Sequence, residues 1–489
     1  MKLEKIVLLA VSLMATSSTY AQYTADALRF SQFENAVDAR FGAMGGAKAA
    51  IGGDISSVYG NPGGLGMFSK SEFSLTPQLN LSNNKITTNG LGSETKNNYL
   101  DLSNVGVVFH TRTYKSGDTK KGLLSLNFGI GYQKRAQFKD DFSYSYLTNG
   151  NGLGDFFAET ASAENRPQEN LIYKTNGAAY DSFLIDTITP SLVDYRPNTY
   201  LDADQVQTVR RTGGSSDVNF SIGTNISNKL FIGASLGLSS FSYTSTEITN
   251  EKGLFTNPNN GQALDYDVDF IRDFDTEGSG VNLKLGAILK PSNELRIGLS
   301  FESPTWFSVR DNYSETLYNN IDPIDGTDSF PFEYDLRTPL KLNGGLAYFI
   351  GNKGFISADI GFVDYAAIKF SSNDAGIDNT ANREIKDRYQ NTINYSLGGE
   401  YKLDKSFLLR AGFHSTGNPY KNLEDKDYTV NSVSAGVGYR FGSYYLDAAL
   451  INSNSNLNYS NYMLNAGNEP TAAIDTRTNK IALTFGVRF

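Results

Sequence analysis

Few residues in this chain are able to carry out covalent chemistry. Its 489 residues include no cysteine and only two histidines, His110 and His414, which excludes thiolate catalysis, disulfides and cysteine-ligated metals. A serine hydrolase needs a histidine beside its nucleophile, and the Gly-x-Ser-x-Gly stretch at 233–237 lies within a strand-like alternation and not at a strand-to-helix turn. We therefore expect no enzymatic activity, no cofactor and no metal site, and a hydrogen-bonding role for His110.

The charge balance excludes another class of partner. The chain carries 43 lysines and arginines against 52 aspartates and glutamates, a formal net charge of −9. It has no run of five basic residues. Because nucleic-acid binding depends on concentrated positive charge, we expect no nucleic-acid partner.

The N-terminus has the pattern of a secretory signal. Lys2 and Lys5 precede the apolar stretch 6–15, and small residues then lead to Thr19-Tyr20-Ala21. The stretch is too short to cross a bilayer, which takes about 20 apolar residues, so it is typical of a cleaved signal peptide. We predict a signal peptide over residues 1–21, with cleavage after Ala21.

The rest of the chain shows the two-residue period of β-strands. In the last ten residues, 480–489, the odd positions from Ile481 to Phe489 are large and apolar, and the even positions are polar or small. Such a strand presents its two sets of side chains on opposite faces. The chain ends on an aromatic residue, as is common in barrels that the barrel-assembly machinery inserts.

Similar alternation recurs along the chain and predicts an all-β protein. Apolar faces such as Leu295/Ile297/Leu299 oppose polar residues such as Arg296 and Glu302. A transmembrane β-barrel needs this division, since lipid surrounds it and its lumen is polar. The sheet must close, because every backbone group in lipid has to pair internally.

The connections between these strands alternate between short and long. Six are short turns, and seven are longer loops, the longest over residues 146–204 and others over 83–97 and 250–270. We therefore predict a 14-stranded antiparallel barrel over residues 71–489, with both ends on the short-turn side.

Residues 22–70 lack strand alternation and are predicted to form a hatch that plugs the lumen. Asp54 is a candidate helix cap, and Asn61-Pro62 is a stop signal. Inward-facing glycines on the strands either make room for this hatch or relieve curvature. These glycines are Gly106, Gly129, Gly131, Gly286, Gly298, Gly436, Gly438 and Gly486.

The predicted hatch carries a motif that is similar to one in a known protein family. Asp54-x-Ser56 followed by Asn61-Pro62-Gly63-Gly64-Leu65 resembles the hatch motif of the FadL/TodX family of outer-membrane channels for long-chain fatty acids and aromatic hydrocarbons. The layout of hatch, strands and terminal Phe489 resembles that family over the whole mature chain. Gly63 departs from the pattern, in which alanine is usual.

The resemblance implies passive uptake of a hydrophobic compound. In the family, a ligand binds an external groove, the hatch rearranges, and the ligand leaves sideways into the membrane through a kinked third strand. Gly129 and Gly131 are the candidate lateral-gate residues, and Trp306 is expected to point inward unless a bulge at Pro304 turns it to the membrane interface. The candidate groove residues are Leu153, Phe156, Phe157, Phe183, Leu184 and Trp306, most of them in the long loop 146–204, whose apolar residues are expected to be exposed. The alternative is that this loop packs on its own helices or on a neighbouring loop.

The expected partners are a hydrophobic small molecule, outer-membrane lipid and the barrel-assembly machinery, and we expect a monomer. Two alternatives to an uptake channel stay open. Some barrels of this appearance carry cargo in protein secretion, and a diffusion porin for polar solutes is another possibility. The sequence does not identify the ligand.

Overall fold

The fold follows from a computed structural model, which describes residues 17–32, 38–89, 91–113, 120–188, 191–257, 260–319, 326–421 and 428–489. Eighteen strand segments form one sheet, and β1 pairs with both β2 and β20, so the sheet closes on itself. Four strand positions are each split into two segments, which gives 14 positions around the barrel and confirms the predicted fold.

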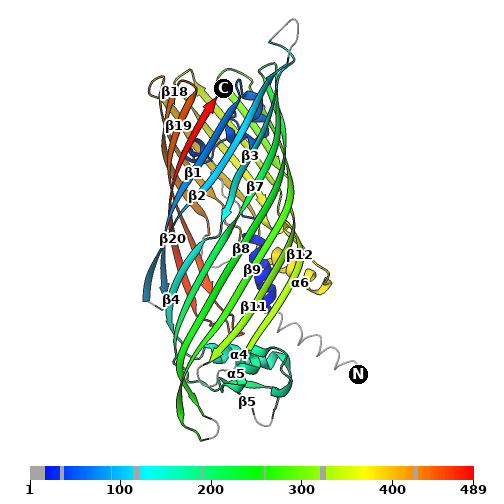
Figure 1. The fold of residues 1–489 in the computed structure, drawn as a ribbon, viewed down its shortest axis with the longest axis vertical. Helices are drawn as coiled ribbons and strands as arrows, with labels where there is room; N and C mark the ends of the chain where they lie inside the picture. Colours follow the sequence, from blue (N-terminus) through cyan, green and yellow to red (C-terminus); the bar gives the residue numbers. More distant parts are fainter. Residues whose placement is uncertain are drawn as a thin grey trace.

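Neighbouring strands pair antiparallel around the whole barrel (Figure 1). In chain order, the strands are β1 (Glu72–Thr88), β2 (Leu91–Arg112), β3 (Leu123–Gln137) with β4 (Asp140–Leu147), β7 (Asp204–Ile226), β8 (Leu230–Thr256), β9 (Ala263–Leu289), β10 (Leu295–Glu302) with β11 (Trp306–Asn319), β12 (Gly326–Arg337) with β13 (Lys341–Ile350), β14 (Gly354–Asp364) with β15 (Lys369–Ser371), β16 (Asn391–Lys402), β17 (Phe407–Thr416), β18 (Val430–Phe441), β19 (Tyr444–Ser460) and β20 (Thr471–Arg488).

The wall has an apolar outer face and a mostly polar inner face. On β20, Ile481, Leu483 and Phe485 point outward and are exposed, whereas Ala482 and Thr484 point inward and are buried. The outward residues would contact lipid acyl chains, and the inward ones face the lumen.

The split strand positions have local causes. Between β10 and β11, Pro304 cannot donate a backbone hydrogen bond, and Pro339 lies at the corresponding break between β12 and β13. The two breaks lie side by side, since Thr338 N donates to Thr305 O (3.0 Å) and Thr305 N donates to Thr338 Oγ1 (2.8 Å). The 3-10 helix η4 (Tyr365–Ala367) separates β14 from β15.

One predicted loop is wrong. Residues 83–97 were expected to form a long connection, but β1 and β2 pair as far as Thr88↔Leu91. The polar residues on both faces of these strand ends hide the two-residue period. The expected loop over 250–270 also shortens, since β8 and β9 pair as far as Thr256↔Ala263.

The helices lie inside the barrel or at its long-loop end. Within and beside the lumen are α2 (Ser17–Arg29), α3 (Ala39–Gly42), η1 (Ile55–Val58), η2 (Pro62–Met67) and α6 (Ala375–Arg388). The long loop holds α4 (Leu153–Glu164), η3 (Gln168–Asn170), α5 (Lys174–Asp181) and the hairpin β5 (Ile185–Thr187)/β6 (Tyr195–Pro197). None of the helices in the described ranges is long and apolar enough to cross a membrane.

Candidate functional site

The segment 38–70, called the plug below, fills the lumen toward the short-turn end. Asp54 caps η1 by accepting from Ser56 N (3.1 Å), as the sequence predicted. Asn61 Oδ1 accepts from Gly63 N (3.0 Å), with Pro62 at the first position of η2. Asn61 Nδ2 donates to Ala49 O (2.6 Å) within the plug and to Ala287 O (3.3 Å) on β9. This side chain therefore joins the plug to the wall.

The inward glycines are where the plug touches the wall. A Cβ built on Gly286 would collide with the Asn61 side chain and Pro62, and one on Gly298 would collide with Ala49. Gly106, Gly129, Gly131 and Gly436 likewise face plug residues, whereas Gly438 and Gly486 face side chains of the wall. The glycines thus serve mainly to admit the plug. Gly63 itself lies close to the β9 backbone, where an added Cβ would be 3.0 Å from Ala287 Cα.

Buried charges also attach the plug to the part of the wall that β14 and β16 form. Arg40 Nε pairs with Glu400 (2.9 Å) and its Nη1 with Asp54 (3.5 Å). Burial disfavours the charge on Arg40, but the carboxylates of Glu400 and Asp54 outweigh it and raise the pKa of the guanidinium. Asp359 Oδ2 accepts from Lys48 N (2.7 Å) and Ala49 N (2.8 Å). Loss of one member of such a buried pair typically costs about 3–5 kcal/mol.

An aromatic cluster lies in the lumen between the plug and the long-loop end. Its wall residues are Phe241, Tyr243, Phe274, Phe307, Tyr313, Tyr334 and Phe370. The N-terminal segment supplies Tyr23, Ala27, Leu28 and Phe30 to the same cluster. Phe30 stacks on Phe241 with ring centroids 4.1 Å apart. The predicted cleavage after Ala21 would leave all four of these N-terminal residues in the mature protein.

Polar contacts hold this segment in the cluster. The Arg29 guanidinium lies 4.2 Å from the centroid of the Tyr243 ring and pairs with Asp26. Tyr389, directly after α6, donates from its OH to Thr24 O (2.9 Å), and Glu384 on α6 accepts from Thr24 Oγ1 (3.1 Å). A short peptide segment therefore occupies the most apolar part of the lumen.

The third strand is broken beside this cluster. The ladder between β2 and β3 ends at Asn104↔Gln133, and β4 then pairs with β7. In the part of the chain that the structure describes, no backbone hydrogen bond joins β2 residues 91–103 to residues 134–147. We call this boundary between the two segments the seam.

Side chains alone close the seam. Asn97 Nδ2 donates to Asp140 Oδ1 (3.1 Å) and Asp141 O (2.9 Å), and Ser93 Oγ donates to Ser143 O (3.0 Å). Phe138, which lies in the break between β3 and β4, packs with its ring centroid 5.7 Å from that of Phe30. The aromatic cluster and the seam are thus in direct contact.

The candidate gate residues lie elsewhere on the same strand. Gly129 and Gly131 are in the regular part of β3, paired with Val108 and Gly106 of β2. They face Val58 and Tyr59 of the plug. The break itself follows Gln137, which the alternation did not reveal because the residues on either side retain strand character.

The candidate groove residues of the long loop are not exposed. Leu153, Phe157 and Leu184 are fully buried, and Phe156 is buried with them. They form the core of a small module, called the cap below, that comprises residues 148–203. Phe183 packs against this core from its edge. The expectation of an exposed apolar surface is wrong because α4, α5 and the β5–β6 hairpin pack these side chains against one another.

Trp306 points outward, contrary to the inward orientation that we derived from the parity of Arg296 and Glu302. Its side chain is 49% exposed, while Phe307 is buried in the lumen. The break at Ser303–Thr305 shifts the parity between β10 and β11. The alternative of an interface position after a bulge at Pro304 agrees with this orientation.

The cap lies across the long-loop end of the barrel (Figure 1). Asp328 on β12 accepts from Lys174 N (3.1 Å) and Thr175 N (3.0 Å). Asn151 Nδ2 donates to Asn468 O (2.6 Å) in the β19–β20 connection. Because these attachments lie on different sides of the barrel, the cap covers its mouth.

The two histidines hydrogen-bond to residues of neighbouring strands. His110 Nδ1 lies 2.7 Å from Asn127 Oδ1, as expected for a hydrogen-bonding residue. His414 lies between Ser396 (2.8 Å) and Thr416 (2.9 Å) on a different part of the wall.

The sequence reading missed the aromatic cluster and the seam. A signal for the first was present: Phe241 and Tyr243 have the parity of the polar face of β8, opposite to Leu236 and Leu238. Large aromatic residues on an inward face indicate an apolar site within a polar lumen. We find no comparable signal for the seam.

Comparisons with known proteins agree with this architecture. A sequence profile of the outer membrane protein transport protein family (OMPP1/FadL/TodX) matches residues 198–489. The chain has no match among curated proteins.

Three solved structures show the same fold. A Pseudomonas aeruginosa FadL homologue is 12% identical over 94% of this chain and 100% of its own, with a TM-score of 0.57. The P. putida toluene transporter TodX is 15% identical over 93% and 98%, with a TM-score of 0.52. The Ralstonia pickettii toluene transporter TbuX is 16% identical over 93% and 99%, with a TM-score of 0.50.

Proposed function

The chain belongs to the OMPP1/FadL/TodX family of outer-membrane transport proteins, and on that premise we propose that it is a channel for the passive uptake of hydrophobic compounds, such as long-chain fatty acids or aromatic hydrocarbons. The short-turn end then faces the periplasm and the cap faces the exterior. Aromatic hydrocarbons enter the proposal because TodX and TbuX are toluene transporters.

The observation that carries the proposal is the shared packing of the aromatic cluster, the N-terminal segment and the break in β3. Phe30 stacks on Phe241 and also contacts Phe138 at the break. A hydrophobic ligand that takes the place of Phe30 would bury its apolar surface among the same rings, at about 25 cal/mol per Å². Displacement of Phe30 would also remove a packing partner of Phe138.

The route runs from the cap to the seam. The ligand first binds at the cap, which must shift because its apolar residues are buried. It next enters the aromatic cluster, and the N-terminal segment and the plug rearrange. Separation of β2 from β4 would break side-chain hydrogen bonds and no backbone ladder, so the ligand can leave sideways into the membrane. No energy source is required for diffusion down a gradient.

Ligand titration of the purified barrel tests this proposal. We expect saturable binding of a long-chain fatty acid or toluene and none of a small sugar. Phe241→Ala removes a ring that would contact the ligand and should weaken binding about tenfold, equivalent to about 1.4 kcal/mol. Phe30→Ala removes the competing side chain and should strengthen binding.

Phe220→Ala is the matched control, since Phe220 is an outward phenylalanine on β7. Unchanged affinity in Phe241→Ala would refute the assigned site. Absence of binding by any hydrophobic compound, together with a co-purifying protein, would favour a cargo-carrying role.

A further inference from the structure

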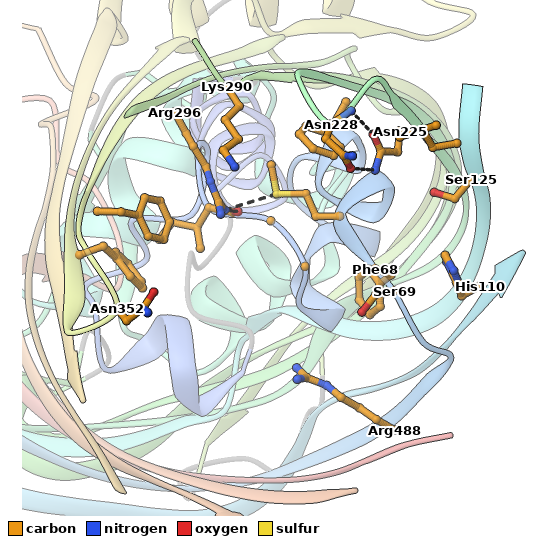
Figure 2. A pocket seen from close by; sticks show the side chains of 18 of the residues that line it. Phe68, Ser69, His110, Ser125, Asn225, Asn228, Lys290, Arg296, Asn352 and Arg488 are labelled. Carbon is orange, nitrogen blue, oxygen red and sulfur yellow. Dashed lines mark hydrogen bonds between the residues drawn. The ribbon is translucent and has the colours of Figure 1, made fainter. Parts of the chain in front are cut away.

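A cavity of about 1040 Å³ opens at the periplasmic end of the barrel, below the plug (Figure 2). Among the residues that the structure describes, eight lysines and arginines line it, and Glu400 is the only lining carboxylate. The whole chain has a formal charge of −9, so composition does not explain this concentration of positive charge. We call this cavity the vestibule.

Three of the eight cations are neutralised within the barrel. Arg40 pairs with Glu400 (2.9 Å), Arg440 with Asp447 (2.8 Å) and Arg488 with Glu72 (2.7 Å). The other five form no ion pair with a carboxylate in the described part of the chain. They are Arg112, Lys121, Lys290, Arg296 and Lys402.

Arg296 shows that this charge is not simply solvated. Its guanidinium is 4.0 Å from the centroid of the Phe349 ring, and Nη1 donates to Ile51 O of the plug (2.6 Å). Its Nε is buried and has no hydrogen-bond partner in the described structure. A half-buried cation with a free donor and no carboxylate is a favourable partner for an incoming anion, because charge-assisted hydrogen bonds are the stronger ones.

Uncharged donors lie among these cations. Asn225 and Asn228 hydrogen-bond to each other (2.8 Å) on the wall of the vestibule, beside Ser125 (Figure 2). Lys290 lies beside this pair, since its backbone N donates to Lys229 O (2.7 Å), and Arg296 lies next to Lys290 in the same view (Figure 2). The vestibule therefore surrounds a central volume with positive charge and polar groups, which is the chemistry of carboxylate and phosphate recognition.

We propose that the vestibule is a binding site for a small anion with a carboxylate or phosphate group. Its volume suits a small organic molecule, since ligand pockets usually measure about 300–1,000 Å³. The anion is either the acidic head of an amphiphile or a free periplasmic anion. The site does not depend on the proposed uptake function, because it lies on the other side of the plug from the aromatic cluster.

Binding measurements on the full barrel in lipid nanodiscs test the site, with octanoate, octyl phosphate, inorganic phosphate and octanol as probes. We expect at least one of the three anions to bind saturably, more weakly at high salt, and octanol not to bind at the vestibule. Binding of inorganic phosphate would identify a free anion as the ligand. Binding of only the octyl anions would identify an amphiphile.

Two variants locate the binding. Lys121→Gln/Lys290→Gln/Lys402→Gln removes three of the unpaired cations without removing a hydrogen bond or ion pair to the plug in the described structure, and it should weaken anion binding at least tenfold. Arg296→Gln should also weaken it, and the first variant keeps the test valid if Arg296→Gln fails to fold. The control, Lys353→Gln/Lys405→Gln, removes positive charge from the same end of the barrel but outside the vestibule lining.

Three results would overturn the proposal. One is the absence of saturable binding by every anion. Another is equal affinity in the wild type and the triple vestibule variant. The third is an equal loss in the control variant, which would show that general surface charge attracts the anion.

Discussion

At the residue scale, the contact between Asn61 and β9 decides how the plug sits. Asn61 caps η2 and bonds to Ala287 O, and Gly286 leaves space for its side chain. The same residue thus starts η2 and joins the plug to the wall. These contacts therefore explain why the hatch motif contains an asparagine at position 61.

Gly286→Val should disturb the plug without disturbing the barrel. The added side chain would collide with Asn61 and Pro62, and such overpacking costs about 1–3 kcal/mol. We expect faster proteolysis within residues 38–70 while the barrel stays folded, as measured by limited digestion.

Gly344→Val is the control for this change. A Cβ on Gly344 would lie 3.6 Å from Leu299 Cδ2, an ordinary contact, on the outer face of the wall. Equal digestion of the two variants would show that the glycine at 286 is not needed for plug packing.

At the element scale, the seam is a strand boundary held by side chains. A continuous ladder such as β8–β9 would have to lose backbone hydrogen bonds to open, whereas β2 and β4 need to lose only contacts such as Asn97–Asp140. The break therefore makes this boundary weaker than a continuous ladder such as β8–β9.

A disulfide across the seam should stop release of the ligand. The chain has no cysteine, so Ser93→Cys/Ser143→Cys introduces one pair where Ser93 Oγ lies 3.0 Å from Ser143 O. In cells, we expect oxidation to abolish uptake of a labelled fatty acid and reduction to restore it.

The matched pair is Ser240→Cys/Ser279→Cys, which are opposite each other in the continuous β8–β9 ladder. Oxidation of this pair should leave uptake unchanged. Normal uptake by the oxidised seam variant would exclude the seam as the exit.

At the scale of the whole molecule, the barrel has two closures. The plug fills the periplasmic half of the lumen, and the cap covers the outer mouth. The cap's ends are adjacent, since Thr148 N donates to Ala203 O (2.9 Å). Either closure can therefore be removed separately.

Deletion of residues 22–64 should give a leaky barrel, because a 14-stranded barrel encloses a wide lumen. We expect entry of a small dye or antibiotic into cells. Replacement of residues 149–202 by a two-residue turn should cause no leak by itself, because the plug remains. An impermeable plug-deletion variant would show that other parts close the lumen.

The sequence by itself determined the closed barrel, its number of strands and the turns of the plug. Alternation within each strand records which face meets lipid, and Asp54, Asn61 and Pro62 act on neighbouring residues. These are local signals, so they can be read without the fold. The strand ends over 83–97 were missed because both of their faces carry polar residues, so no apolar alternation marks them.

The tertiary structure alone decided where the apolar sites are. Trp306 points outward because a break at Pro304 resets the parity of its strand, and Phe156 and Phe157 are buried because separate elements of the cap pack on them. Phe30, Phe138 and Phe241 meet only after the barrel closes. Residues so far apart in the chain come together only through the register of all the strands between them. No local sequence pattern therefore predicts these contacts.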